Sequence, residues 1–274
     1  MKVSTAVIKG QLKINRFNIP YRVYGKGGLS LVCINGVQQS MAMWHSFISR
    51  FAQQHKIVLF DFPGQGKSSV ESGPLSASID EQVDILSGVV NATGVSNIIL
   101  CSASWGGVVA MVFAVRYPHL VKRLILAGMG TKPNKKMIET IKKGCKINDG
   151  ERKAMAQVLI KSFGENLPEQ IKERISKQFT AMSKESLRAF CEHGLLIISA
   201  KSLADIIDFK KIKVETILIN GEHDTIIDLE DVKLLAAQIP NCQMKVIKNV
   251  GHFLHLEDED VLHIYSDIVS TLSS

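Results

Sequence analysis

Residues 97–114 decide the fold, and their sequence is NIILCSASWGGVVAMVFA. The apolar residues 97–101 predict a buried strand, and residues 108–114 continue as a buried helix. Ser104 stands at the junction, with small residues on both sides. A chain that turns this sharply from strand to helix strains the serine backbone and lifts its hydroxyl clear of the sheet, in the layout of a nucleophile elbow.

The motif departs from the usual Gly-x-Ser-x-Gly at one position, because Ser102 replaces the first glycine. The replacement adds a little bulk two residues before Ser104. A serine among small residues also occurs between strand and helix in many α/β proteins as a plain loop residue. Whether Ser104 is a nucleophile therefore depends on whether the sequence also provides a base and an acid for it.

The candidate partners are Asp224 and His252. A serine nucleophile needs a base within hydrogen-bond reach and usually a carboxylate that orients the base. Asp224 follows the strand-like residues 214–220, and His252 follows the strand-like residues 244–247. Ser104, Asp224 and His252 thus come in the chain order nucleophile, acid, base, each just past the C-terminal end of a predicted strand.

Both partners also have plainer interpretations. His252 alone is compatible with a hydrogen-bonded structural histidine, and Asp224 alone with a turn or helix-cap residue. Glu222 and Asp228 compete for the acid position, and we favour Asp224 because it ends a Gly-x-x-Asp turn after the strand. The loop after residues 124–126, the other place where such an acid can stand, contains no carboxylate.

The predicted oxyanion hole consists of the backbone N–H groups of Val37 and Trp105. Preorganised N–H donors stabilise the negative charge that develops on a substrate oxygen. Val37 lies in the loop after the strand-like residues 29–34, beside Asn35 and Gly36. Gly36 by itself favours a simple turn, and only the serine motif favours the oxyanion hole.

Length and cysteine content place the chain among ordinary globular proteins. Its 274 residues suit one α/β domain with an inserted segment. Its five cysteines are widely spaced, so we expect reduced thiols and neither a disulfide framework nor a zinc site. No apolar stretch approaches the ~18 residues of a membrane span, and the N-terminal apolar run is too short for a signal peptide. We expect a soluble, cytoplasmic protein.

The sequence motifs for binding phosphate, metal ions or nucleic acid are incomplete in this chain. Gly66-Lys67-Ser68 looks like the end of a phosphate-binding loop, but Asp61 stands where that loop requires a glycine. His252 and His255 have no third ligand in a suitable frame, and basic residues are not interleaved with aromatic ones. We therefore expect no cofactor, no metal and no nucleic acid.

Predicted strands alternate with predicted helices over most of the chain. Most of the later strands are continuous apolar runs, as expected for strands covered on both faces. The alternation predicts an α/β fold with a doubly wound, mainly parallel sheet of about eight strands. The predicted strands are residues 3–9, 12–24, 29–34, 56–60, 97–101, 122–127, 214–220 and 243–248, and the predicted helices are residues 44–54, 80–93, 104–117, 229–238 and 259–272.

The alternation stops between residues 131 and 213, where amphipathic helical patterns follow one another. We expect a helical cap here, inserted over the active-site edge between core segments 1–130 and 214–274. Residues 131–213 carry 18 Lys and Arg against 10 Asp and Glu, a net +8, whereas the whole chain is +7. This charge suits an acidic partner, such as an acyl carrier protein or the phosphates of coenzyme A, and is equally compatible with a solvated surface.

Together these motifs resemble the α/β-hydrolase superfamily over essentially the full length of the chain. Within it the chain looks like the 3-hydroxyacyl-ACP O-acyltransferases and transacylases, the group of the rhamnolipid HAA synthases and PhaG. The resemblance implies transfer of 3-hydroxyacyl chains from acyl carrier protein to a second hydroxyacyl chain or to coenzyme A. The residues that carry it are Ser102-Ala103-Ser104-Trp105-Gly106-Gly107, Val58-Leu59-Phe60-Asp61, Ile34-Asn35-Gly36, Ile219-Asn220-Gly221 with Asp224, and Gly251-His252-Phe253-Leu254.

Three functions remain open at this point. The first is acyl transfer from fatty or 3-hydroxyacyl thioesters and esters, a step of lipid metabolism, through a triad of Ser104, His252 and Asp224. The second is a carboxylesterase or thioesterase with the same triad, in which water takes the acyl group. The third is a non-catalytic binding protein on a hydrolase scaffold, against which the intact triad argues.

Overall fold

The computed structural model describes residues 7–37, 39–146, 151–199 and 202–272. Its sheet has nine strands in the order β1-β2-β4-β3-β6-β7-β8-β9, with the short β5 paired to β2. The pairs of β2 are antiparallel, and every pair from β4 to β9 along that order is parallel. The mainly parallel sheet predicted from the sequence is confirmed. Its strands are β1 (Val7–Ile14), β2 (Phe17–Tyr24), β3 (Ser30–Ile34), β4 (Lys56–Phe60), β5 (Ser69–Val70), β6 (Ile98–Ala103), β7 (Val121–Ala127), β8 (Glu215–Gly221) and β9 (Cys242–Ile247).

The first two strands form a hairpin whose predicted boundaries were wrong. We expected a break at residues 10–11 and one strand over 12–24, but the chain turns at Asn15. Asn15 has a φ of 50°, in the left-handed region that asparagine tolerates better than most residues. Gly10 stays inside β1 because it pairs with Tyr21, and a Cβ at this glycine would lie 2.1 Å from the tyrosine ring.

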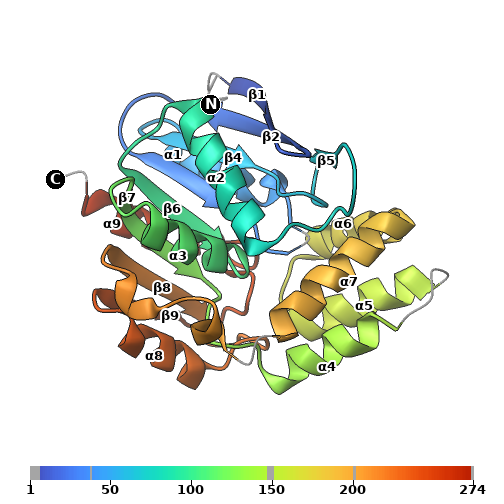
Figure 1. Ribbon diagram of the computed structural model, residues 1–274. Helices are drawn as coiled ribbons and strands as arrows, with labels where there is room; N and C mark the ends of the chain where they lie inside the picture. Colours follow the sequence, from blue (N-terminus) through green and yellow to red (C-terminus); the bar gives the residue numbers. More distant parts are fainter. Residues whose placement is uncertain (1–6, 38, 147–150, 200–201, 273–274) are drawn as a thin grey trace.

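Helices cover both faces of the sheet, and α2 and α3 cross its front in Figure 1. One layer contains α2 (Ile79–Thr93), α3 (Gly106–Arg116) and α8 (Leu229–Gln238), and the other contains α1 (His45–Phe51) and α9 (Val261–Ser270). Side chains alternate along a strand, so the neighbours Leu100 and Cys101 belong to opposite layers. Both faces of the sheet are therefore apolar, which is why its strands read as continuous apolar runs.

The remaining elements follow the predictions closely. Strands β3, β4 and β6 to β9 begin and end within two residues of the predicted positions. The helix expected over 44–54 instead begins with a 3₁₀ turn and ends at Phe51. No described helix combines the length and apolar character needed to cross a bilayer. Short 3₁₀ helices lie at Met41–Trp44, Leu203–Asp205, Phe209–Lys211 and Leu254–Leu256.

In the described residues between β7 and β8 there are four α-helices, which are grouped beside the sheet at the right of Figure 1. We call them the cap helices: α4 (Lys135–Gly144), α5 (Arg152–Phe163), α6 (Glu169–Thr180) and α7 (Lys184–Ser199). They enclose a small apolar core of their own, made by Met155, Ala156, Phe179 and Leu187. We propose that residues 131–213 form the cap as a unit, between core segments 1–130 and 214–274.

Asp231 ties the start of the cap segment to the core. Its buried carboxylate accepts hydrogen bonds from the backbone N–H and hydroxyl of Thr131 and from the N–H of Lys132. Leu203, near the other end of the segment, donates from its N–H to Thr131 O at 2.7 Å. The two ends of the segment are thus joined to each other and to α8.

Asp231→Ala should lower the free energy of unfolding by about 3 kcal/mol, because three donors lose a buried, charged acceptor. Urea unfolding followed by circular dichroism measures the change. Glu230→Ala is the matched control, since the Glu230 side chain is 82 % exposed on the same helix and pairs only with Lys233 among the described residues. Its effect should stay below about 0.5 kcal/mol. Equal effects of the two substitutions would contradict the role given to Asp231.

Candidate active site

Ser104 occupies a strained turn between β6 and α3. Its φ is 47°, in the left-handed region that serine rarely adopts. Two backbone hydrogen bonds of 2.8 Å hold the turn, from Ser104 N to Ala127 O and from Gly107 N to Ser104 O. A Cβ at Gly106 would lie 2.6 Å from Asn35 O, so only glycine lets α3 approach the loop after β3 this closely. These features are those of the nucleophile elbow expected from the sequence.

Ser102, the departure from the usual motif, fits without disturbing the turn. The side chain is fully buried in β6, and its hydroxyl donates a weak hydrogen bond of 3.5 Å to Ile125 O in the neighbouring strand. The extra bulk is therefore taken up between two parallel strands. The position two residues before Ser104 does not require glycine here.

Asp224 and His252 are in contact although 28 residues separate them in the chain. The distance from His252 Nδ1 to Asp224 Oδ2 is 2.8 Å, and the Asp224 side chain is fully buried. The second carboxylate oxygen accepts the N–H groups of Ile226 and Ile227 at 2.8 and 3.0 Å. The competing acids bond elsewhere, Glu222 to the N–H of Asn249 and Asp228 to the side chain of Asn134.

The loop around His252 is held by Glu257, a residue that no sequence motif singled out. Its two carboxylate oxygens accept the N–H groups of Gly251 and Phe253 at 2.7 and 2.9 Å, one on each side of the histidine. Gly128 touches the ring from the sheet side, where a Cβ would lie 2.8 Å from a ring carbon. The loop after β7 thus contributes no carboxylate to the site, but leaves room for the imidazole.

The Asp224–His252 contact sets the charge of both groups. Burial raises the pKa of Asp224, but the charge and hydrogen bond of His252, together with the hydrogen bonds from the N–H groups of Ile226 and Ile227, hold this pKa below its ordinary value. Burial lowers the pKa of His252, whereas the charge and hydrogen bond of Asp224, with the charge of Glu257, raise it above its ordinary value. The pair favours an ionised carboxylate beside a strongly basic imidazole.

The backbone N–H groups of Val37 and Trp105 donate no hydrogen bond to a described residue. Trp105 directly follows the serine, and Val37 and Ser104 both line the same cavity. The oxyanion hole of these two N–H groups stays a prediction, with which their lack of a described acceptor is compatible.

Buried polar residues fix the loop that carries Val37, and two of them, Asp61 and Gln65, were not predicted to do so. The side-chain amide of Asn35 donates to Asp61 Oδ1 at 3.2 Å, and its oxygen accepts the indole N–H of Trp44 at 2.8 Å. The Asp61 carboxylate also accepts the N–H of Met41 at 2.7 Å. Gln65 donates to Gly36 O at 3.0 Å, directly before Val37.

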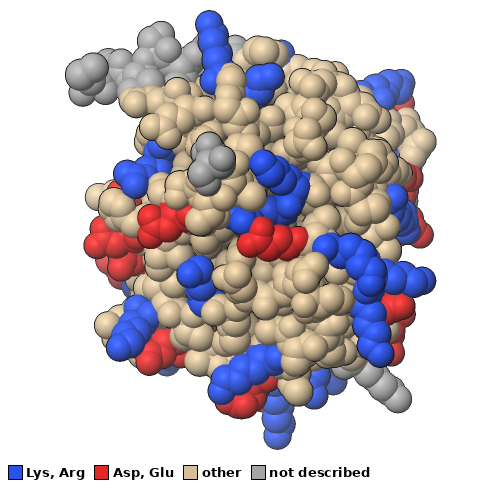
Figure 2. Space-filling view, turned by 90° about the vertical axis from the view of Figure 1, so that its left-hand side faces the viewer, with Lys and Arg blue, Asp and Glu red and all other residues tan. Residues whose placement is uncertain are grey.

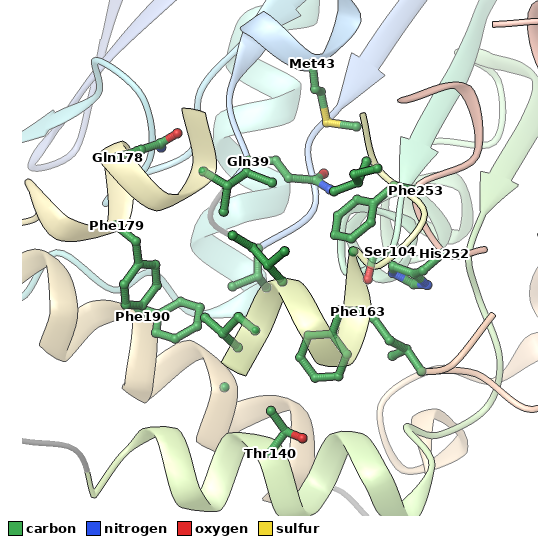
Figure 3. Close-up of a pocket in the computed structure, with 18 of the residues that line it drawn as sticks. Gln39, Met43, Ser104, Thr140, Phe163, Gln178, Phe179, Phe190, His252 and Phe253 are labelled. Carbon is green, nitrogen blue, oxygen red and sulfur yellow. The ribbon is translucent and has the colours of Figure 1, made fainter. Parts of the chain in front are cut away.

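Ser104 and His252 open onto a cavity of about 260 Å³, which we call the main pocket. Figure 3 shows the two side chains next to each other at one end of this pocket, with Phe163 and Phe253 beside them. The walls come mostly from apolar side chains of the cap helices. At the other end, the rings of Phe179 and Phe190 pack edge to face with their centroids 5.2 Å apart. The arrangement places the Ser104 hydroxyl and the His252 imidazole at one end of a mostly apolar chamber.

The second histidine of this segment, His255, has a different place. Its ring stacks on Trp44 with centroids 5.4 Å apart, and its Nε2 lies 3.1 Å from Met43 O. Burial lowers the pKa of His255 to about 4, so the ring is neutral. Among the described residues, no group of three His, Cys, Asp or Glu side chains is arranged to hold a metal ion.

Comparison with known proteins places the chain in a family. The family model described as the alpha/beta hydrolase fold matches residues 30–259. The chain belongs to the α/β-hydrolase family. It is 22 % identical to the (R)-3-hydroxydecanoyl-ACP:CoA transacylase of Pseudomonas putida, over 84 % of this chain and 78 % of that protein. It is 24 % identical to a 2-hydroxy-6-oxononadienedioate/2-hydroxy-6-oxononatrienedioate hydrolase of the same species, over 90 % and 89 %.

A solved structure confirms the fold. The α/β hydrolase MGS-M2, from a Medee basin deep-sea metagenome library, superposes with a TM-score of 0.80 at 20 % identity, covering 94 % of this chain and 97 % of that one. The fold class and the superfamily resemblance expected from the sequence are thus correct. The relatives named above include both a transferase and a hydrolase, so family membership leaves the acceptor of the acyl group open.

Asp224→Asn should shift the pH dependence of this α/β hydrolase to lower pH. A general base must be neutral, so activity rises as the pH passes upward through the His252 pKa. Removing the Asp224 charge lowers that pKa, because Asp224 is the main group that raises it. We expect the acid limb of the kcat/KM profile to move down, with kcat lower by about 10⁴-fold because the amide favours the wrong tautomer.

Assays of p-nitrophenyl ester hydrolysis at a series of pH values measure the acid limb of the kcat/KM profile. An NMR titration of His252 measures its pKa directly. Glu222→Gln, on the same loop, is the matched control and should leave the limb in place, since Glu222 bonds to the N–H of Asn249. An unchanged His252 pKa in Asp224→Asn would refute the coupling.

Proposed function

We propose that this α/β hydrolase is a serine acyl hydrolase or acyltransferase, acting on esters or thioesters of fatty or 3-hydroxyacyl chains. The observation that carries the proposal is the main pocket, because Ser104 and His252 lie at one end of a chamber whose walls are mostly apolar. An alkyl chain in this chamber leaves water, which is favourable in proportion to the apolar area buried. Its carbonyl carbon is then held at Ser104.

In the proposed mechanism, His252 takes the Ser104 proton while the hydroxyl attacks the carbonyl carbon. Asp224 holds the imidazole in the right tautomer and stabilises its positive charge. The N–H groups of Val37 and Trp105 stabilise the tetrahedral oxyanion. His252 then protonates the leaving alcohol or thiol, and an acyl-enzyme remains on Ser104.

The second half of the reaction depends on the acceptor. Water gives a free acid, whereas an alcohol or thiol gives a new ester or thioester. The named transacylase relative supports transfer, and so does the positive balance of residues 131–213. Figure 2 shows another face of the molecule, on the side of α9 and the C-terminus, where basic and acidic side chains are interspersed. An acyl carrier protein or coenzyme A would accordingly approach the cap segment.

Ser104→Ala should reduce hydrolysis of p-nitrophenyl decanoate by about 10⁴-fold or more, since the nucleophile is lost while the fold is kept. Mass spectrometry of the intact protein, taken from quenched reactions, also tests for the acyl-enzyme. The acyl-enzyme should form on the wild type and not on Ser104→Ala. Ser102→Ala is the matched control, because it removes a neighbouring hydroxyl that faces Ile125 O. Should Ser104→Ala keep the wild-type rate, Ser104 would not be the nucleophile. A wild type that neither hydrolyses the ester nor forms an acyl-enzyme would be a non-catalytic member of its family.

Incubation with 3-hydroxydecanoyl carrier protein tests the acceptor. With coenzyme A and excess 3-hydroxyacyl carrier protein present, we expect mass spectrometry to find a coenzyme A thioester or a dimer of two hydroxyacyl chains. Ser104→Ala under the same conditions sets the background. Free 3-hydroxydecanoic acid as the sole product would reject transfer and leave a thioesterase.

A further inference from the structure

Helix α6 carries five charged side chains, and four of them pair with one another. Lys172 lies 2.8 Å from Glu169, and Lys177 lies 3.6 Å from Glu173. These pairs span three and four residues, the spacings at which side chains meet on a helix. The fifth charged residue, Arg174, makes no ion pair with a described residue.

Arg174 is also distinguished by its place in the main pocket. Among the described residues that line the pocket, it is the only Lys, Arg, Asp or Glu. The paired charges of α6 do not line the pocket. A permanent positive charge therefore borders an apolar chamber without a carboxylate to neutralise it, and an arginine remains charged at any physiological pH.

Gln178 extends this polar position by one helical turn. It stands four residues after Arg174, so both side chains are on the same face of α6, and both line the main pocket. Figure 3 places Gln178 at the side of the pocket opposite Ser104 and His252. Gln178 is thus separated from Ser104 and His252 by the apolar part of the chamber, and Arg174 lies one helical turn before Gln178.

We propose that the substrate carries an anionic group, a carboxylate or a phosphate, that binds Arg174 while the scissile carbonyl lies at Ser104. The planar guanidinium fits the two oxygens of such a group, and the Gln178 amide adds a further donor. This inference rests on the proposed acyl chemistry and adds one requirement, that the substrate carry an anion. A substrate with only an apolar chain would offer the Arg174 guanidinium no ion-pair partner. The anion belongs either to the far end of the acyl chain or to the leaving group.

Two matched pairs of substrates separate these sources. Decanoyl-coenzyme A against decanoyl-N-acetylcysteamine compares a leaving group that has phosphates with a neutral one. The p-nitrophenyl monoester of decanedioic acid against p-nitrophenyl decanoate compares an acyl chain that ends in a carboxylate with one that ends in a methyl group. We expect the wild type to have a higher kcat/KM for the anionic member of one pair.

Arg174→Gln should reduce that preference by about twofold to fivefold, as expected for one charge-assisted contact of a solvent-exposed side chain. The preference should also fall as salt is added. Lys177→Gln is the matched control, because it makes the same change of charge on the same helix at a side chain that does not line the pocket. It should leave the preference unchanged.

The inference is overturned if the wild type prefers neither anionic substrate, or if Arg174→Gln and Lys177→Gln change the preference equally. Cleavage of the neutral substrates would still support the acyl chemistry in that case. If none of the four substrates is cleaved, the proposed function fails, and binding becomes the readout. Calorimetry would then compare decanoyl-coenzyme A and decanedioate binding to Ser104→Ala with binding to the Ser104→Ala, Arg174→Gln double variant, and equal affinities for both ligands would reject the anion site.

Discussion

The parallel pairing of the central strands is the constraint on which the site depends. From β4 to β9 along the sheet, every neighbouring pair runs in the same direction, so the C-terminal ends of β3, β6, β8 and β9 share one edge. The loops after these four strands carry Val37, Ser104, Asp224 and His252 in turn. Reversing any one strand would move its residue to the opposite edge of the sheet.

The buried Asp224–His252 contact has a second role besides orientation. A carboxylate with a fully buried side chain is costly unless a positive charge and hydrogen bonds compensate it. Here the imidazole and two backbone N–H groups do so. The same interaction raises the pKa of His252, so the stability of the loop and the basicity of the imidazole have one physical origin.

In the proposed function, the core provides the chemistry and the cap segment provides substrate recognition. The reactive groups all stand on loops of the core, where the register of the sheet positions them. The chamber walls come mostly from α4 to α7, which have their own small apolar cluster and are joined to the core through Thr131 and Asp231. Under this proposal, substitutions in the cap helices, Arg174 among them, change which substrate fits and leave the loops of the core unchanged.

Much of the core could be read from the sequence because its signals are local. Continuous apolar runs mark strands covered on both faces, and small residues around Ser104 mark a tight strand-to-helix turn. The chain order of Ser104, Asp224 and His252 restricted the candidates further. The hairpin was misjudged at Gly10, since glycine usually signals a turn, whereas here it makes room for Tyr21 on the partner strand.

The sequence by itself thus determined the elements, their alternation and the residue types of the site. Only the tertiary structure decided that Glu257 holds the His252 loop and that Asp61 and Gln65 hold the Val37 loop. It also decided that Arg174 lines the pocket without an ion pair to any residue the structure describes. The reason is that the backbone geometry of helices and strands gives apolar residues a regular spacing, which can be recognised in any short stretch of sequence. Polar contacts between loops have no period and depend on which distant segments the fold brings together.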